Sequence, residues 1–189
     1  MESDRRTRRT KKLLTDAFIE LLTQKKLNEI TIKELCEKAD VNRGTFYLHY
    51  QDIYDLKQQI EADICTELAK LIMPLSNVRE LDSYQLFYSL FSFTKKNAGL
   101  FNALLGPNGD IAFMTHLKNL FKEYYLSPIM QGQPITYARN IEYAYDFVSA
   151  GFTELVIGWL SNNNPASIEE MARLTSKMLF DGLPALLSE

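Results

Sequence analysis

The feature that most constrains the fold is a pair of short helical patterns separated by three residues. Thr31 precedes the first pattern, which then places apolar residues on one face of a helix: Ile32, Leu35, Cys36 and Ala39. Asp40-Val41-Asn42 interrupts this pattern, and another short helix is expected over residues 43–50. Two short helices joined by so tight a turn are typical of a helix-turn-helix, whose second helix can enter the major groove of DNA.

Helical periodicity continues on both sides of this pair. A one-sided apolar stripe precedes it and ends in a polar stretch at residues 24–29; the stripe consists of Leu13, Leu14, Ala17, Phe18, Leu21 and Leu22. Asp52 is expected to cap a helix that ends at residue 73, before Pro74. Five more helices are expected over residues 83–96, 98–105, 110–126, 136–162 and 167–186. We therefore predict an all-α protein of about nine helices.

Two capping boxes mark helix starts within this pattern. Thr31 with Glu34, and Ser167 with Glu170, have the spacing at which each side chain satisfies a free amide of the first turn. Both helices are therefore expected to begin directly after these Thr and Ser residues.

The composition excludes several classes of protein. Apolar residues make up 46% and charged residues 24%, as in a globular chain, and six Pro and eight Gly are few for an all-β protein. The longest apolar stretches are too short to span a membrane, and no apolar region follows the charged N-terminus as in a secretory signal. Cys36 and Cys65 offer no disulfide framework. We therefore expect a cytoplasmic protein without a membrane partner.

The charge is distributed unevenly along the chain. The net charge is −3, yet residues 1–57 hold 12 of the 21 basic residues and only 10 of the 24 acidic ones. The excess is sharpest in an N-terminal basic arm that includes Arg5, Arg6, Arg8 and Arg9. A basic arm on an acidic body fits a polyanion partner, and a solvated, frayed terminus is the alternative interpretation.

The segment TIKELCEKADVNRGTFYLHY, residues 31–50, resembles the DNA-binding signature of the tetracycline-repressor (TetR) family of transcriptional regulators. The match extends into the preceding helix and includes the string Gly-Thr-Phe-Tyr at residues 44–47. Three positions depart from the family pattern. Asp40 replaces a Gly of the turn, Cys36 replaces an Ala, and Ile53 replaces a Lys that often reaches a DNA phosphate. Asp tolerates the left-handed backbone that such a turn needs, so the turn is expected to survive.

The resemblance implies a set of DNA-contacting residues, which we combine with the chemistry of each side chain. Arg43 suits a bidentate pair with guanine, and Thr45 suits a thymine methyl or a phosphate. The Gly44 amide, the Tyr47 hydroxyl and His49 suit phosphates. Helix capping is an alternative role for Asn42 and the primary role for Thr31. The candidate DNA-binding residues are Thr31, Lys33, Asn42, Arg43, Gly44, Thr45, Tyr47 and His49, with Arg5, Arg6, Arg8 and Arg9 of the arm.

The second half of the chain resembles the C-terminal domain of a TetR subgroup common in low-GC Gram-positive bacteria. The similarity covers most of residues 80–180 and is carried by FTKKNAGLFNALLG, FVSAGFTELVIGWL and SIEEMARL. We therefore expect a helix-turn-helix domain at residues 1–50, a connecting helix at 51–74 and an effector-binding and dimerisation domain at 75–189.

The last two helices are expected to form a homodimer interface. Gly151 and Gly158 lie seven residues apart on one helical face, where they allow close helix approach, and Leu155 lies between them. A glycine inside a helix destabilises it by about 1 kcal/mol, which indicates a packing reason. Packing within one chain is the alternative interpretation. A two-fold dimer would match a near-palindromic operator.

Aromatic residues accumulate in this half, with 17 of the 22 beyond residue 57. The resemblance implies a small-molecule effector pocket, and the alternative is an ordinary hydrophobic core. The candidate pocket residues are Phe87, Phe91, Phe113, His116, Tyr143, Phe147 and Trp159.

No enzyme motif stands out. Two His and two Cys do not make a metal cluster, and neither a phosphate-binding loop nor a nucleophile elbow is present. We therefore predict no catalytic residue, no metal and no cofactor. The predicted function is a dimeric DNA-binding regulator, a repressor that a small-molecule effector releases from double-stranded DNA. The alternative is a TetR-like coactivator or interaction module whose effector is a protein partner.

Overall fold

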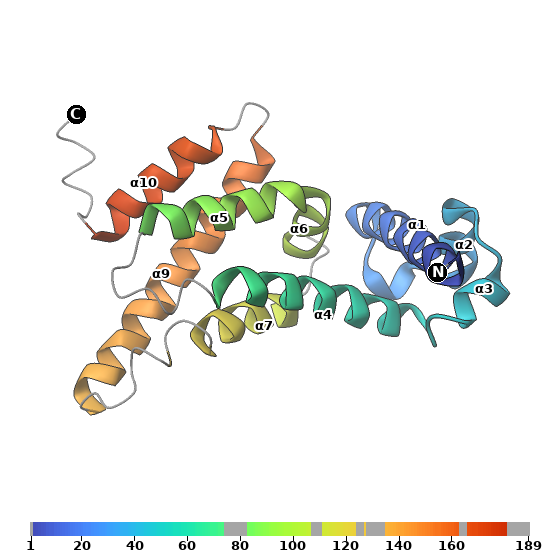
Figure 1. Cartoon of the computed structure of the whole chain (residues 1–189), viewed down its shortest axis with the longest axis horizontal. Coiled ribbons are helices and arrows are strands. Elements are labelled where there is room, and N and C mark those ends of the chain that lie inside the picture. The colour runs from blue at the N-terminus through green and yellow to red at the C-terminus, as the bar shows by residue number, and fades with distance from the viewer. Residues whose placement is uncertain are drawn as a thin grey trace. The chain divides into compact units, whose positions relative to one another are not determined.

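A computed structural model describes residues 2–73, 83–106, 111–123, 127, 135–162 and 166–180. These residues contain nine α-helices, one short 3-10 helix and no strand (Figure 1). The all-α prediction is confirmed. The chain divides into two compact units. Unit 1 comprises Met1–Cys65 and Gly99–Met114, and unit 2 comprises Thr66–Ala98 and Thr115–Glu189.

Unit 1 is built on helix α1, Glu2–Gln24, which packs on α2, Ile32–Ala39. Five of the six residues of the expected apolar stripe are buried, Leu14 and Phe18 fully, whereas the first residue of the stripe, Leu13, is 40% exposed. The helix begins eleven residues before the stripe, so the basic arm forms its first turns. A 3-10 helix, Leu27–Glu29, occupies the polar stretch that follows.

The helix-turn-helix follows the local signals of the sequence closely. The turn keeps its shape because Asp40 adopts the left-handed conformation (φ 52°, ψ 45°) that ends α2. Helix α3 spans Arg43–Tyr47 and is shorter than the expected 43–50, because Leu48 already forms its C-cap. The next helix, α4 (Ile53–Ile72), begins where the Asp55 amide donates to Oδ1 of Asp52 at 2.8 Å.

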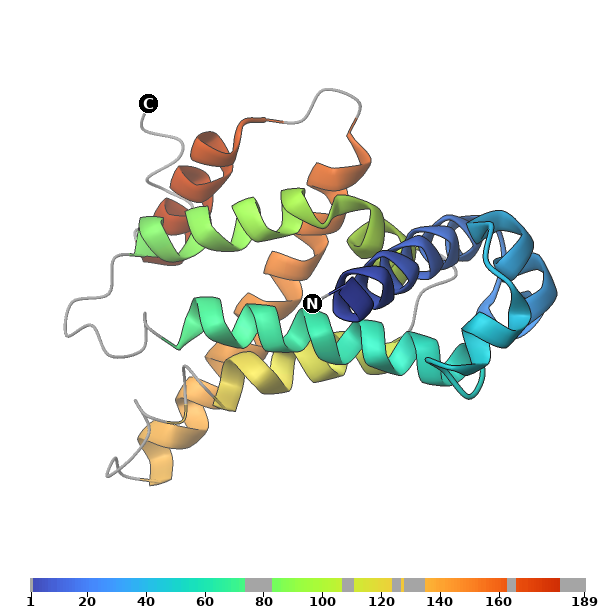
Figure 2. The same ribbon diagram turned by 45° about the vertical axis from the view of Figure 1, so that its right-hand side comes forward.

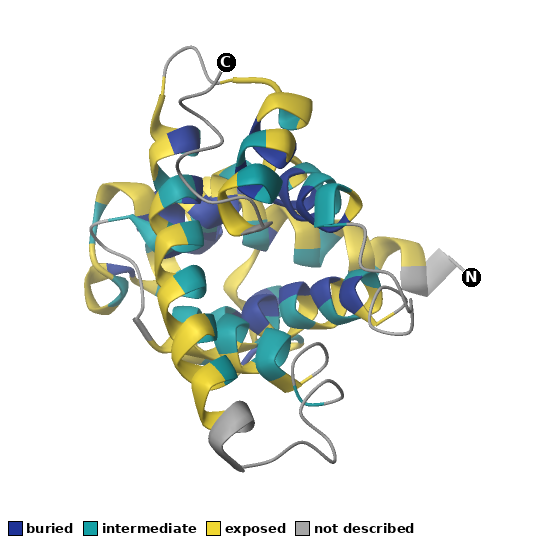
Figure 3. Cartoon of the chain, turned by 90° about the vertical axis from the view of Figure 1, so that its left-hand side faces the viewer, coloured by how far each residue is buried: buried dark blue, intermediate teal, exposed yellow. Residues whose placement is uncertain are grey.

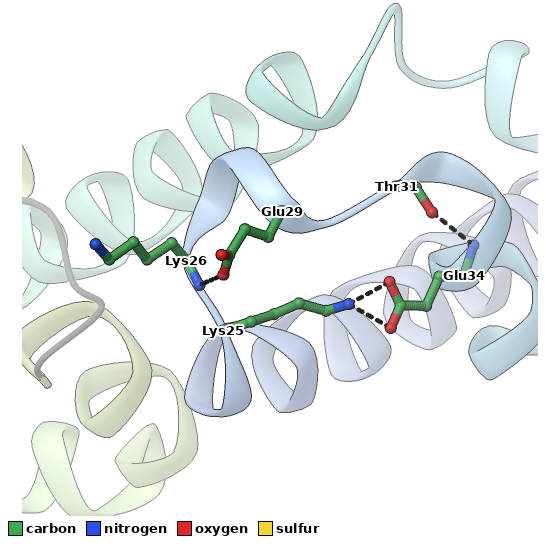
Figure 4. Close-up of polar contacts among 5 residues, drawn as sticks. All are labelled: Lys25, Lys26, Glu29, Thr31 and Glu34. Atoms are coloured by element: carbon green, nitrogen blue, oxygen red, sulfur yellow. Dashed lines mark hydrogen bonds and ion pairs between the residues drawn. The ribbon is translucent and has the colours of Figure 1, made fainter.

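The Thr31 capping box forms only in part. The Glu34 amide donates to Oγ1 of Thr31 at 3.2 Å, as predicted. The Glu34 carboxylate does not return the bond, because Nζ of Lys25 binds both of its oxygens at 2.5 Å (Figure 4). The reciprocal half of the prediction is therefore wrong, because the lysine directly after helix α1 binds the carboxylate instead.

Unit 1 also includes a segment that is distant in sequence. Helix α6 (Ala98–Leu105) belongs to it from Gly99 onward, as does the start of α7 (Ile111–Phe121). Phe101 and Phe113 are buried there with ring centroids 6.5 Å apart. The α4 and α7 helices each contribute residues to both units. The domain boundaries at residues 50 and 74 stay a prediction.

Unit 2 has α5, α9 and α10 as its main elements. Helix α5 (Ser83–Lys96) lies along α10 (Ile168–Phe180), and α9 (Ile135–Ser161) also contacts α5 (Figures 1 and 2). The second capping box forms completely: the Glu170 amide donates to Ser167 Oγ at 3.2 Å, and the Ser167 amide donates to Glu170 Oε2 at 2.6 Å. Hydrogen bonding of the Glu170 carboxylate, first to the Ser167 backbone amide and then to the Ser167 side chain, lowers the pKa of Glu170.

The core of unit 2 is an aromatic cluster between α5 and α9. The ring of Phe91 lies 5.4 Å from that of Phe152 and 5.2 Å from that of Trp159. The indole N–H of Trp159 donates to the Ala166 carbonyl at 2.7 Å. Figure 3 shows buried residues following one side of the helices and exposed residues the other, as one-sided stripes predict.

Candidate nucleic-acid interface

Helix α3 has a buried side and an exposed side. Phe46 is fully buried, and its ring packs against Tyr50, which is also buried, with centroids 5.6 Å apart. On the other side, Arg43 and Gly44 are exposed and Tyr47 is 58% exposed. The buried pair of Phe46 and Tyr50, which we call the anchor, therefore leaves the candidate DNA-contacting residues of α3 facing solvent.

The anchor residue Tyr50 also connects α3 to α1. Nζ of Lys11 lies 5.7 Å from the centroid of the Tyr50 ring, within reach of a cation–π interaction. Burial and the nearby carboxylates of Asp63 and Asp55 raise the pKa of Tyr50 to about 12. Tyr50 is therefore a neutral packing residue at physiological pH.

The two cap residues have defined local roles. Oδ1 of Asn42 accepts from the Gly44 amide at 2.8 Å, and Oγ1 of Thr31 accepts from the Glu34 amide. Both side chains are therefore helix caps, one of the two roles considered for each. Their contact with DNA stays a prediction.

Gly44 lies where α3 leaves little room for a side chain. A Cβ atom at this position would lie 3.3 Å from Asn42 Oδ1, closer than most such contacts. The glycine therefore preserves the cap and leaves the backbone open to solvent.

Ion pairs fix α2 against α1. Lys25 directly after α1 holds Glu34, and Lys38 near the end of α2 pairs with Glu20. The two pairs join the start of α2 to the residue after α1 and the end of α2 to the last turns of α1. Lys33 is exposed and pairs loosely with Glu37 at 3.9 Å.

The remaining candidate residues of unit 1 fall into two groups, one half-buried near Tyr50 and one exposed at the start of α1. Thr45 and His49 are half-buried, and the His49 ring contacts Tyr50 at 6.3 Å between centroids. The arm residues Arg5, Arg6, Arg8 and Arg9 are exposed in the first turns of α1.

The position that carries lysine in many family members does not reach the surface. Ile53 is 6% exposed at the start of α4. Lys57, one turn later, lies with its Nζ 2.7 Å from Oε1 of Glu61, and both side chains are largely buried. Ile53 therefore offers no cation here, and the ammonium of Lys57 is paired with Glu61.

Sequence reasoning missed Leu48. This side chain directly follows α3 and is 80% exposed, far more than the other apolar residues of the motif. Its spacing of four residues from Gly44 places both on one helical face and is the signal that identifies it.

The candidate effector residues do not form one cluster. Phe87, Phe91 and Trp159 are buried in unit 2, whereas Phe113 belongs to the core of unit 1. The other three are exposed: His116, Tyr143 and Phe147. Their assignment to a common pocket stays a prediction.

The candidate dimer residues lie on an open face of α9. Gly151 and Gly158 are exposed, and a Cβ atom at either would meet no described atom within 4 Å. Leu155 is half-buried at the edge of this face. Packing within the chain does not explain the two glycines among the described residues.

The described part of the chain contains neither a metal-ligand cluster nor a membrane-spanning helix. Within it, no group of three His, Cys, Asp or Glu side chains has the arrangement of metal ligands. No described helix is long and apolar enough to cross a membrane.

Comparison with known proteins places this architecture in a family. Residues 82–181 match the TetR_C_8 family, the C-terminal region of transcriptional regulators. The chain is 23% identical over 164 residues to the uncharacterized HTH-type transcriptional regulator YxbF of Bacillus subtilis (strain 168). The match covers 84% of this chain but 41% of YxbF, so the chain spans less than half of that relative's length.

Solved structures share the fold across nearly the whole chain. The TetR transcriptional regulator from Streptococcus agalactiae 2603V is 20% identical with a TM-score of 0.61, covering 95% of this chain and 98% of that one. The fatty acid degradation regulator FadR from Bacillus halodurans is 14% identical with a TM-score of 0.67, covering 92% and 96%. The family match and the helix-turn-helix in unit 1 lead to one conclusion: the chain belongs to the TetR family of DNA-binding transcriptional regulators.

Proposed function

We propose that the exposed side of α3 reads the major groove of a specific operator. The supporting observation is the position of Arg43, which is exposed in the first turn of a helix whose opposite side is anchored by Phe46. A guanidinium so presented can donate two hydrogen bonds to O6 and N7 of guanine. The Tyr47 hydroxyl and Lys33 contribute to affinity through phosphates.

The basic arm contributes affinity without sequence preference. Its arginines lie on helical turns of α1, and a helix with its side chains is about 10–12 Å wide. The minor groove is only about 6 Å wide, so the arm meets phosphates rather than base edges in this conformation.

The test separates these two roles by titration at several salt concentrations. The operator is first selected from genomic fragments that the protein retains. Arg43→Ala is expected to lose roughly 1–3 kcal/mol per half-site on the operator and less on random duplex. Arg9→Ala is expected to weaken both and to shallow the log–log salt dependence by about 0.9.

Lys26→Ala is the matched control, because its exposed side chain points away from the labelled polar contacts in Figure 4. It is expected to change binding little. Equal losses on both duplexes for Arg43→Ala would assign it to phosphates. A wild-type protein without preference for any genomic duplex would reject the operator proposal.

The proposed functional unit is a homodimer formed through the exposed face of α9. Tyr143 is 68% exposed and Phe147 is 83% exposed, and Gly151 and Gly158 follow on the same face. Large exposed aromatic residues in a row with glycines are typical of a protein interface. A two-fold dimer would place two α3 helices about 34–36 Å apart, or a multiple of this, on a near-palindromic operator.

Gly158→Ala tests the interface because it is expected to stabilise the single chain and to destabilise the dimer. Alanine favours the helix by up to about 1 kcal/mol, and no described atom of the chain obstructs its Cβ. The isolated chain should therefore become more stable, whereas the dimer should dissociate more readily. Gly158→Leu should dissociate it further, since overpacking typically costs about 1–3 kcal/mol.

Sedimentation across a dilution series measures the dimer. Gly99→Ala is the control, since that glycine is exposed in α6 and an added Cβ would make an ordinary 3.7 Å contact with Ile19. It should leave the association state unchanged. Unchanged association of Gly158→Leu would assign the interface to another face.

The proposed regulation is repression relieved by a small-molecule effector bound in the C-terminal region. Family membership supports ligand binding, and the cluster of Phe87, Phe91 and Trp159 offers an apolar site if a ligand opens it. An effector can shift the protein between DNA-competent and incompetent states only as far as its affinities for them differ.

The effector is sought by combining thermal stability with DNA release. The screen covers cytotoxic, aromatic and metabolic compounds. It includes fatty acyl derivatives, since the similar structure from Bacillus halodurans is that of a fatty acid degradation regulator. A true effector raises the melting temperature and weakens operator binding. A compound that only stabilises the protein is rejected. If no small molecule is found and a co-purifying protein alters DNA binding, the alternative is supported, in which the effector is a protein partner.

A further inference from the structure

Leu48 is the unexplained feature of the helix-turn-helix surface. It forms the C-cap of α3 with helical backbone angles (φ −71°, ψ −19°), and 80% of the residue is exposed. Phe46, two residues earlier, is fully buried. Packing within unit 1 therefore accounts for Phe46 but not for Leu48.

Gly44 leaves the surface beside Leu48 open. A residue that follows another by four positions lies one turn along the same helical face, and its side chain leans back toward that earlier residue. Gly44 has no side chain, so the Leu48 methyl groups meet no Cβ there. Arg43 and Tyr47 are exposed next to these two positions and make the surroundings polar and cationic.

The chemistry of this surface indicates what Leu48 contacts. The positive charge of Arg43 and of the arm complements a polyanion. Base edges in the major groove offer hydrogen-bonding groups and one apolar group, the C5 methyl of thymine. We propose that Leu48 packs on a thymine methyl in each half-site and so determines the preference for thymine there. This inference rests on the proposed reading of the major groove by α3.

Uracil substitution tests the contact, because deoxyuridine lacks only the methyl group. Each thymine of the selected operator is replaced in turn, in both half-sites. Affinity is measured for the wild type and for Leu48→Asn, which keeps the branched shape of the side chain but replaces its two methyl groups with polar groups. Loss of one buried methyl corresponds to about fourfold weaker binding per half-site. We expect one thymine position with this loss in the wild type and no loss there in Leu48→Asn.

Two more variants make the test specific. Leu48→Met keeps an apolar side chain and should retain the response to uracil. Thr45→Ser removes the other methyl group of the motif that could contact thymine, and it should retain the response as well. Melting temperatures should be unchanged for the Leu48 variants, because the side chain is exposed.

The outcomes separate this inference from the function on which it rests. If uracil weakens the wild type and Leu48→Asn equally, another residue reads the methyl and the inference is wrong. An operator that tolerates uracil at every thymine also overturns it, while leaving sequence-specific binding intact. If the wild type selects no duplex, the proposed function fails, and this inference fails with it.

Discussion

Removing the charge of Lys57 tests how the buried ion pair of α4 contributes to stability. Nζ of Lys57 lies 2.7 Å from Oε1 of Glu61, and the side chains are 12% and 9% exposed. Oε1 makes no well-aligned hydrogen bond among the described residues. The two charges are therefore close but not well aligned for a hydrogen bond. If one partner is removed, the charge of the other must be hydrated, and the two side chains differ in how easily they can reach water.

The two single substitutions should differ in magnitude. Lys57→Met leaves the short Glu61 carboxylate buried without its cation, so we expect a loss near the lower end of the range for broken buried pairs, about 3 kcal/mol. Glu61→Leu leaves Lys57, whose long chain can turn its ammonium toward water, so we expect about 1 kcal/mol. The double variant Lys57→Met/Glu61→Leu should be near neutral, because neither charge remains buried.

Thermal unfolding at a fixed protein concentration measures these differences, since self-association makes the melting temperature depend on concentration. A loss of 3 kcal/mol corresponds to roughly 6–12 °C for a chain of this size. Lys33→Met is the matched control: its i,i+4 pair with Glu37 is 3.9 Å long and both side chains are 67% exposed, so little should change. Equal effects of Lys57→Met and Lys33→Met, or a double variant that loses the sum of its singles, would refute the reasoning.

Three further predictions concern single residues. Ser167→Ala should raise the pKa of Glu170 part of the way to its ordinary value in an NMR titration, because alanine removes the side-chain contact and keeps the backbone amide that lowers the pKa most. Because the folded-state pKa is lowered, these contacts stabilise the fold above the ordinary carboxyl pKa, and their contribution is lost as the pH falls through the lowered pKa. Asp40→Gly should stabilise the protein by up to about 1 kcal/mol by relieving the left-handed conformation, whereas Asp40→Val should destabilise it in urea titrations. Phe91→Ala should cost about 3–5 kcal/mol and shift the unfolding transition monitored by fluorescence of Trp159, the only tryptophan.

Helix starts and turns were predictable from the sequence because their signals act over a few residues. Asn42 and Ser167 accept hydrogen bonds from amides two and three residues later, so the cap needs no distant partner. The left-handed turn at Asp40 depends in the same way on one backbone angle that Asp tolerates. The same local rules place Arg43 in the first turn of α3, and hence at the candidate interface.

Contacts between residues that are distant in the chain determine the features that local signals do not predict. Glu34 has the spacing of a capping box, but the packing of α1 on α2 brings Lys25 to its carboxylate. Helical periodicity predicts the same burial for Phe91 and Phe147, yet Phe91 is fully buried and Phe147 is 83% exposed. A helical stripe identifies which residues share a face, but not which helix covers that face. The sequence by itself determined the helices, their caps and the DNA-binding motif, because these depend on local hydrogen bonds and backbone preferences. The tertiary structure decided which aromatic residues form the core and which faces stay open, because burial depends on contacts between helices far apart in the chain.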